Sequence, residues 1–200
     1  MAGVAATGRR GTRRSPRGRA QARAHWRALP AAAACAPASL QPFLIEHGSL
    51  SGLLRAHGRE LRVLRLRQGL HAGPVGGSWA REVLLLLDGR PVVWARSVLP
   101  AQALRGPWRA LRGFGTRPLG DWLFQRADVR RGPVELRRLG RADPAVRAAA
   151  RALERAGLPP LPLGHAVPLW ARRSAFVRRG CALWLIELFL PAAGGLRPGA

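Results

Sequence analysis

The sequence contains no lysine, tyrosine or asparagine and only two cysteines among 200 residues. Two cysteines cannot build a disulfide framework or a four-ligand metal site. The five histidines show no metal-ligand spacing and stand in no motif with a nucleophile. No apolar run approaches the roughly 18 residues that a membrane-spanning helix needs. We therefore expect a cytoplasmic protein with no membrane span and no metal site.

Charge is strongly one-sided, because 34 basic residues, all of them arginine, outnumber 10 acidic residues to give a formal net charge of +24. Arginine beside abundant alanine, glycine and proline is typical of GC-rich coding, so the charge is weak evidence for nucleic acid binding. An RNA-binding sheet would carry aromatic residues with basic flanks, whereas the tryptophans here stand in apolar runs. We expect anionic small-molecule ligands and no nucleic acid partner.

The beginning of the chain differs in composition from the rest. Residues 1–45 contain eight arginines and no acid, and residues 1–36 show no clean apolar periodicity. Such a segment buries too little apolar area to offset its ordering entropy. Twin arginines leave an export signal open, and the acid-free pattern also suits a transit peptide or a misassigned start codon. We predict a disordered basic arm over 1–36 and one domain over 37–200, so a chain beginning near Ala38 should fold and keep its activity.

From Leu40 onward the pattern is that of a globular domain. Leucines at helical spacing predict two short helices between Leu40 and Leu54, separated by a turn in which Ser49 caps the second helix. Further helices are expected over 101–112 and 144–156. The expected strands are 61–67, 79–87, 91–99, 134–139, 171–178 and 181–190. Asp88-Gly89 and Arg179-Gly180 are typical of hairpin turns. These elements predict a single α+β domain, an antiparallel sheet with flanking helices that enclose a ligand cavity.

Glu187 is the single charge in a nine-residue apolar strand, where alternation places it on one face with Leu183, Leu185 and Phe189. A buried charge without a partner is costly, so Glu187 should face a cation, a ligand or water. A functional carboxylate is one interpretation. The alternative is a structural ion pair with an arginine of the neighbouring strand, Arg173 or Arg178.

Arg96 presents the converse case, because it stands between Trp94 and Val98 on one face of its strand. Its planar fork suits a carboxylate ligand. The structural alternatives are stacking on Trp94 or an ion pair with Glu82 across the hairpin.

Four segments stand together in a recognisable order: 92–100 (VVWARSVLP), 117–124 (RPLGDWLF), 169–174 (LWARRS) and 185–191 (LIELFLP). Over most of residues 40–192 the chain resembles the chorismate pyruvate-lyase family. The resemblance implies cleavage of chorismate to 4-hydroxybenzoate and pyruvate, without a cofactor, for ubiquinone synthesis. It also implies a closed cavity lined by Arg96, Glu187 and the backbone amides of Leu50 and Leu119.

In that arrangement Arg96 and the two amides hold the ring carboxylate, while Glu187 contacts the ring hydroxyl and moves a proton. Arg172 or Arg173 would meet the enolpyruvyl carboxylate. We expect a monomer whose partners are chorismate and 4-hydroxybenzoate.

A non-catalytic module of the same fold is the main alternative, since similar domains sense effectors in bacterial transcription regulators. Those regulators carry a DNA-binding helix-turn-helix domain, which 36 disordered residues cannot form.

Overall fold

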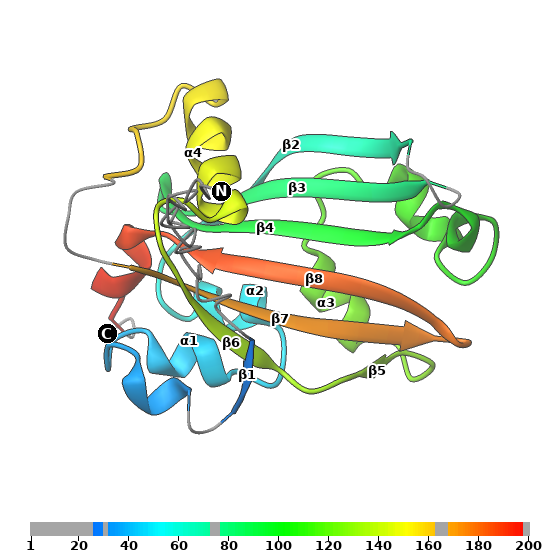
Figure 1. The fold of residues 1–200 in the computed structure, drawn as a ribbon, viewed down its shortest axis with the longest axis horizontal. Helices are drawn as coiled ribbons and strands as arrows, with labels where there is room; N and C mark the ends of the chain where they lie inside the picture. The colour runs from blue at the N-terminus through cyan, green and yellow to red at the C-terminus, as the bar shows by residue number, and fades with distance from the viewer. Residues whose placement is uncertain (1–25, 30–31, 73–76, 163–167, 198–200) are drawn as a thin grey trace, which may run out of the picture.

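The computed structural model describes residues 26–29, 32–72, 77–162 and 168–197. At its centre is an 8-stranded sheet with the order β1-β6-β7-β8-β4-β3-β2, in which β5 pairs with β7 off this path. Every pairing is antiparallel. Short helices flank the sheet, which confirms the predicted α+β class (Figure 1).

The strands are β1 (Arg27–Ala28), β2 (Leu61–His71), β3 (Ser78–Leu87), β4 (Arg90–Pro100), β5 (Arg130–Arg131), β6 (Glu135–Leu139), β7 (Leu169–Arg178) and β8 (Cys181–Phe189). The α-helices are α1 (Gln41–Ile45), α2 (Leu50–Arg55), α3 (Leu119–Phe124) and α4 (Pro144–Arg155). The 3-10 helices are η1 (Ala33–Cys35), η2 (Ala101–Arg105), η3 (Arg109–Gly113) and η4 (Pro191–Gly195).

Two tight hairpins form the centre of the sheet, β3–β4 and β7–β8, as predicted. Their turn residues have positive φ angles, 48° and 78° at Asp88 and Gly89 and 47° and 74° at Arg179 and Gly180. Two successive positive φ angles are the signature of a type I′ turn, which matches the twist of the strands. The first hairpin also contains a register shift, because Leu85 pairs with Val93 while Leu86 pairs with Pro91. Val92 is thus an extra residue of β4, a β-bulge.

The sheet has two faces with separate hydrophobic cores. The inner face is the one to which Ala95, Leu185 and Glu187 belong, and it packs against α1, α2 and α3. The outer face is the one to which Trp94, Ile186 and Leu188 belong, and α4 covers part of it. In Figure 1, α2 and α3 lie behind β7 and β8, while α4 crosses in front of the strands.

The helical predictions are confirmed at α1, α2 and α4, and Ser49 caps α2 by accepting a hydrogen bond from the amide of Gly52. The single helix expected over 101–112 is wrong. Two 3-10 helices, η2 and η3, take its place. Gly106 and Pro107 separate them, since proline lacks the amide proton of a continuous helix. The helix α3 was not predicted from the sequence.

The predicted boundary between residues 36 and 37 is also wrong. Trp26 packs on the outer-face core, and β1 pairs with β6. Ala32, Ala33 and Ala36 are buried in the inner-face core. Small apolar side chains suffice here because they fill narrow gaps in a close-packed interior. The remainder of the predicted arm, residues 1–25, lies outside the described residues.

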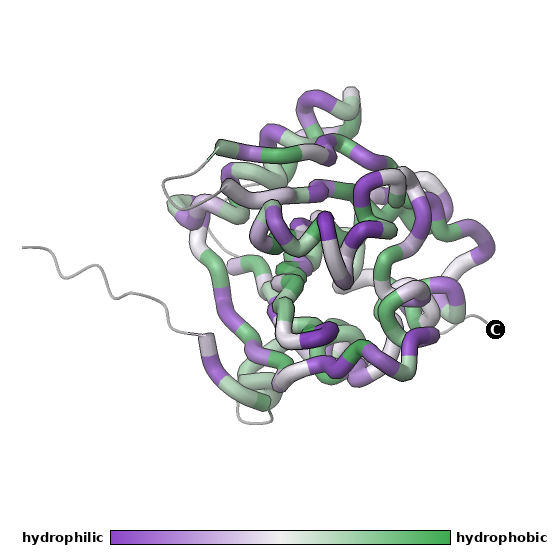
Figure 2. Tube along the Cα trace, turned by 90° about the vertical axis from the view of Figure 1, so that its right-hand side faces the viewer, coloured by the Kyte–Doolittle hydropathy of each residue, from purple (hydrophilic) through white to green (hydrophobic). Residues whose placement is uncertain are grey.

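Hydrophilic and apolar stretches alternate all around the outline of the molecule (Figure 2). Within the described part of the chain, no helix has both the length and the apolar character that crossing a membrane requires.

Candidate active site

Glu187 lies in β8 on the inner face and forms a buried ion pair with Arg172 of β7. The register pairs these two residues directly, and Arg172 Nε donates to Glu187 Oε2 at 2.5 Å. The side chains are only 2% and 8% exposed. Arg172 Nη1 also donates to the carbonyls of Phe43 and Glu46, at 2.7 and 3.1 Å. The sequence predicted a cation from β7, but named Arg173 or Arg178 as the structural partner rather than Arg172.

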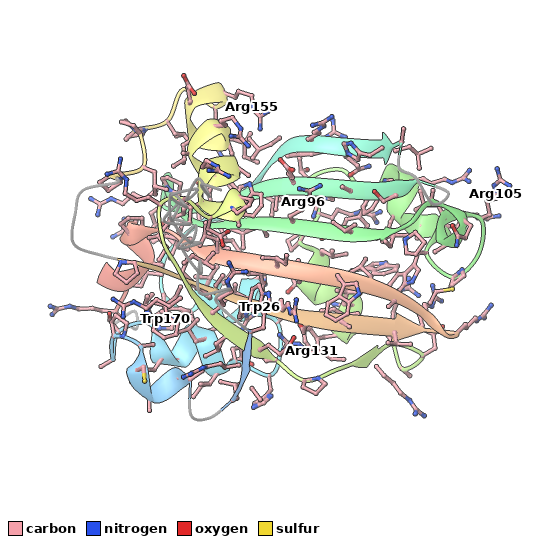
Figure 3. The ribbon with its side chains drawn as sticks, viewed as in Figure 1. Trp26, Arg96, Arg105, Arg131, Arg155 and Trp170 are labelled. Atoms are coloured by element: carbon pink, nitrogen blue, oxygen red, sulfur yellow. The ribbon has the colours of Figure 1, made fainter. Side chains whose placement is uncertain are left out.

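Arg131 of β5 adds a second cation to this group (Figure 3). Its Nε donates to the hydroxyl of buried Ser174 at 3.0 Å. Its Nη1 donates to the carbonyls of Glu46 and His47, at 3.1 and 2.8 Å. Burial, and then the neighbouring Arg172, lower the pKa of Arg131 to about 10, although Glu187 and Glu46 act in the opposite direction. Two arginines, Arg131 and Arg172, thus lie beside two glutamates, Glu187 and Glu46.

Arg81 of β3 is a third arginine on the inner face. It pairs with Ser97 of β4, which pairs with Leu185 of β8, so all three side chains lie on the face of Glu187. Arg81 is 3% exposed. Burial first, and then repulsion from Arg65 and Arg117, lower its pKa to about 10. With strands about 4.8 Å apart, the backbones of β3 and β8 are separated by roughly 10 Å.

The guanidinium of Arg81 holds the loop that leads into α3. Nε and Nη2 donate to the carbonyl of Gly115 at 3.1 and 2.9 Å, and Nη2 donates to that of Arg117 at 2.8 Å. Gly115 has a φ of 66°, a conformation that favours glycine. Because Arg117 stands two residues before Leu119, Arg81 fixes the start of α3.

The helices α2 and α3 each begin at a residue predicted to bind ligand, Leu50 and Leu119 respectively. The amide of a first helical residue has no intrahelical carbonyl to bind. Asp121 joins the two helices, accepting from Ser49 Oγ at 2.5 Å and from Arg55. Burial acts to raise the pKa of Asp121, but the hydrogen bonds from Arg55 and Ser49 outweigh it and hold that pKa below its usual value.

Arg96 does not join this site, and the prediction that it forms a functional pair with Glu187 is wrong in its geometry. The register pairs Arg96 with Ile186 and Ala95 with Glu187, so Arg96 and Glu187 project from opposite faces of the sheet. Arg96 Nε lies 3.7 Å from Glu82 Oε1. The structural alternative, an ion pair across the hairpin, is therefore the one observed.

Sequence reasoning missed Arg81 and Arg131 and named Arg172 only in a secondary role. A signal for Arg81 was present, because this arginine interrupts the apolar strand 79–87 just as Arg96 interrupts the next strand. No comparable signal marks Arg131, which stands beside another arginine in a two-residue strand.

Within the described residues, no group of three or more histidine, cysteine, aspartate or glutamate side chains is placed to hold a metal ion. The absence of a cofactor and the closed cavity both stay predictions.

Comparison with known proteins decides the family. The model of the family described as "Chorismate lyase" matches residues 20–193. The chain belongs to the chorismate lyase family. Its members include a probable chorismate pyruvate-lyase of Azoarcus sp. (strain BH72), 43% identical over 172 residues that cover 78% of this chain and 86% of that protein. Another probable chorismate pyruvate-lyase, from Thiobacillus denitrificans, is 40% identical over 171 residues, which cover 78% of this chain and 85% of that protein.

Solved structures resemble this chorismate lyase family member more distantly. The ligand-binding domain of a putative GntR-family transcriptional regulator from Bordetella bronchiseptica has a TM-score of 0.44 and 20% identity, covering 66% of this chain and 85% of that one. The C-terminal domain of the histidine utilization repressor from Pseudomonas syringae has a TM-score of 0.45 and 13% identity. The match covers 67% of this chain and 94% of that domain.

Proposed function

We propose that the protein is a chorismate pyruvate-lyase, a carbon–oxygen lyase that converts chorismate into 4-hydroxybenzoate and pyruvate. The family match over residues 20–193 carries this proposal. The charges of the inner face support it, because three arginines, Arg81, Arg131 and Arg172, outnumber the two glutamates, Glu46 and Glu187. A cationic interior suits a substrate that is a dicarboxylate.

The reaction requires little chemistry from the protein. The ether bond between the ring and the enolpyruvyl group breaks, the neighbouring ring carbon that bears the hydroxyl group loses its proton, and the ring becomes aromatic. The departing enolpyruvate gains a proton and becomes pyruvate, so the balance needs no oxidant, reductant or second substrate. The protein has to orient the dicarboxylate, stabilise the leaving oxygen and handle a proton.

We assign to Arg81 the role that the resemblance gave to Arg96. The carbonyls of Gly115 and Arg117 accept hydrogen bonds from Nε and Nη2, so Nη1 is left to bind the ring carboxylate together with the amides of Leu50 and Leu119. A guanidinium held by a loop is pre-organised, which lowers the entropy cost of binding.

Glu187 contacts the ring hydroxyl and takes part in proton transfer. Arg172 keeps the carboxylate of Glu187 oriented, because its Nε donates a hydrogen bond to Glu187 Oε2 at 2.5 Å. Arg131 attracts the enolpyruvyl carboxylate through its positive charge. Its guanidinium is held in place by three hydrogen bonds, to Ser174 and to the carbonyls of Glu46 and His47.

The direct test mixes the purified protein with chorismate and follows 4-hydroxybenzoate by absorbance and pyruvate by a coupled lactate dehydrogenase assay. Both products should form in equal amounts. A protein that binds 4-hydroxybenzoate but releases no pyruvate would instead be the non-catalytic binding module. The monomeric state, a destination in ubiquinone synthesis and action without a cofactor stay predictions. If the reaction needs no metal ion, exhaustive chelation should leave its rate unchanged.

A further inference from the structure

The segment 92–100 is one of the four that resemble the family, yet its arginine projects away from the inner face. Arg96 belongs to the outer face and lies 3.7 Å from Glu82 Oε1. The two residues that flank it, Ala95 and Ser97, belong to the inner face. Ser97 is the polar residue that β4 directs to this face, since the others are apolar: Val93, Ala95 and Leu99. What β4 contributes to the chemistry of the site therefore depends on Ser97.

Ser97 is buried, with 2% of its surface exposed, and buried polar side chains nearly always have a hydrogen-bond partner. The other buried polar side chains of the inner face have one. Arg81 donates to loop carbonyls, Ser174 accepts from a guanidinium, and Arg172 pairs with Glu187. In the described part of the chain the Ser97 hydroxyl has no such partner, and it is not among the partnerless atoms that are sealed from open space. This hydroxyl is therefore available to a ligand.

The register places Ser97 between the two groups that the proposed reaction uses at either end of the ring. The strand β4 lies between β3 and β8 (Figure 1), and Ser97 pairs with Arg81 of β3 and with Leu185 of β8. The Cβ atoms of directly paired residues are about 4.5–5.5 Å apart. Ala95 pairs with Glu187, so Ser97 is a diagonal neighbour of Glu187, at roughly 7–8 Å. A ring held by Arg81 and Glu187 thus lies over Ser97.

The same row of side chains continues toward the cation proposed for the enolpyruvyl carboxylate. Leu185 pairs with Ser174 of β7, whose hydroxyl accepts a hydrogen bond from Arg131 Nε at 3.0 Å. With strands about 4.8 Å apart, the backbones at Ser97 and Ser174 are separated by roughly 10 Å. A substrate that binds Arg81 through one carboxylate and Arg131 through the other therefore crosses the position of Ser97.

The ether oxygen of chorismate is the atom of the substrate that needs a donor at this place. It is attached to the ring carbon next to the one that bears the hydroxyl, so it lies beside the group that Glu187 contacts. When the carbon–oxygen bond breaks, this oxygen keeps the electron pair and gains negative charge. A donor already in position stabilises such a charge. Arg81 and Arg131 are each assigned to a carboxylate, which leaves Ser97 as the donor of this row for the ether oxygen.

We propose that Ser97 is a further catalytic residue, whose hydroxyl donates a hydrogen bond to the ether oxygen of chorismate. This proposal rests on the proposed lyase function. The electron pair of the broken bond stays on the enolpyruvate oxygen, and Ser97 keeps its own proton, so the step needs no co-reactant. The product 4-hydroxybenzoate has no ether oxygen. The Ser97 hydroxyl therefore contributes to turnover and not to product affinity, whereas Arg81 contributes to both.

The test compares turnover with product affinity in variants of this position. Ser97→Ala should lower kcat by about 10-fold or more, because a donor to a charged oxygen is lost. Its Kd for 4-hydroxybenzoate, measured by calorimetry, should stay within about twofold of the wild-type value. Ser97→Thr keeps the hydroxyl on a side chain that suits a strand, so it should retain kcat within about threefold. Thermal melts show that both variants are folded.

Ser78→Ala is the matched control, because it removes a half-buried hydroxyl at the start of β3 and should leave kcat unchanged. Wild-type kcat in Ser97→Ala would overturn the role of Ser97 and leave the lyase function standing. An equal loss of product affinity would place the hydroxyl on the ring carboxylate instead, and a Ser97→Thr protein as slow as Ser97→Ala would assign the effect to packing. Either result overturns the proposal. A wild-type protein that releases no pyruvate would refute the lyase function, and the role of Ser97 with it.

Discussion

The buried pair of Glu187 and Arg172 has two interpretations at the scale of single residues. As a structural pair it stabilises the β7–β8 hairpin, and removing one partner would leave an uncompensated buried charge. As a functional pair it holds a carboxylate in a fixed orientation beside Arg131. Arg81 adds a buried cation to the same face that is bound to carbonyl groups rather than to an acid, which favours the functional interpretation, because a structural pair needs no further cation.

Glu187→Gln tests this point. Glutamine keeps the shape and an oxygen for Arg172, so we expect a folded protein whose turnover is lower by about 100-fold or more, the range for a positioned acid or base. Steady-state kinetics and thermal melts measure the two effects. The matched control is Glu135→Gln, which breaks the half-exposed pair with Arg173 on the outer face and should leave turnover unchanged. Wild-type turnover in folded Glu187→Gln, with stability lower by about 3–5 kcal/mol, would make the pair structural.

Arg81→Met tests the carboxylate site. We expect the KM for chorismate to rise by about 10-fold or more, because a charged hydrogen bond to the substrate is lost, with a smaller effect on kcat. Arg62→Met, at an exposed position of β2, is the control for the loss of one positive charge. An unchanged KM in a folded Arg81→Met protein would confine Arg81 to holding the 115–117 loop.

At the scale of elements, the contact between α2 and α3 sets the distance between the amides of Leu50 and Leu119. A Cβ atom on Gly120 would lie 3.0 Å from Ser49 Oγ, so glycine permits this close approach. Asp121 then joins the helices through Ser49 and Arg55. Neither six-residue helix would be stable alone, and their geometry therefore depends on tertiary contacts.

Asp121→Asn should loosen this contact with a defined pH dependence. The pKa of Asp121 in the folded state lies below 3.8, the value of an unperturbed aspartate. The ionised carboxylate therefore contributes stability that is complete above the unfolded pKa and is lost as the pH falls through the folded pKa.

At pH 7 we expect the unfolding free energy of the wild-type protein to exceed that of Asp121→Asn by no more than about 1 kcal/mol. The difference is small because Arg55 is exposed and solvent screens its ion pair with Asp121. Urea unfolding of both proteins at pH 7 and at a series of pH values descending below 3.8 measures the difference, which should shrink toward the acid end of the series. A difference that persists there would assign the effect to packing rather than to charge.

At the scale of the whole molecule, the sheet includes a short first strand. The β1 strand extends the sheet beyond β6, and Ala32, Ala33 and Ala36 fill the inner-face core. Residues 26–36 are thus part of the folded unit, apart from residues 30–31, which lie outside the described residues.

Two truncations test this boundary. A chain that begins at Ala38 should lose about 2 kcal/mol or more of unfolding free energy, since each buried methyl group contributes about 0.8 kcal/mol. A chain that begins at His25 keeps β1 and the buried alanines, so it should unfold at the urea concentration of the full chain. Equal stability of the two truncations would restore the boundary at residue 36.

The sequence by itself determined the two central hairpins, the alternation of their strands and the start of α2, because local physics governs them. Asp88-Gly89 and Arg179-Gly180 dictate tight turns, alternation dictates the faces of each strand, and Ser49 caps α2 through a contact within its own turn. It also identified Glu187, because a lone charge in an apolar strand stands out without any knowledge of its neighbours.

Only the tertiary structure decided which arginines share a face with Glu187. A two-residue turn without interruption would place Arg81 opposite Arg96, whereas the bulge at Val92 shifts the register so that Arg81 faces Ser97 and Arg96 faces Glu82. Alternation then assigns Arg81 to the inner face and Arg96 to the outer face. Because one extra residue reverses the side on which every following side chain projects, the strand pattern alone could not distinguish these two arginines.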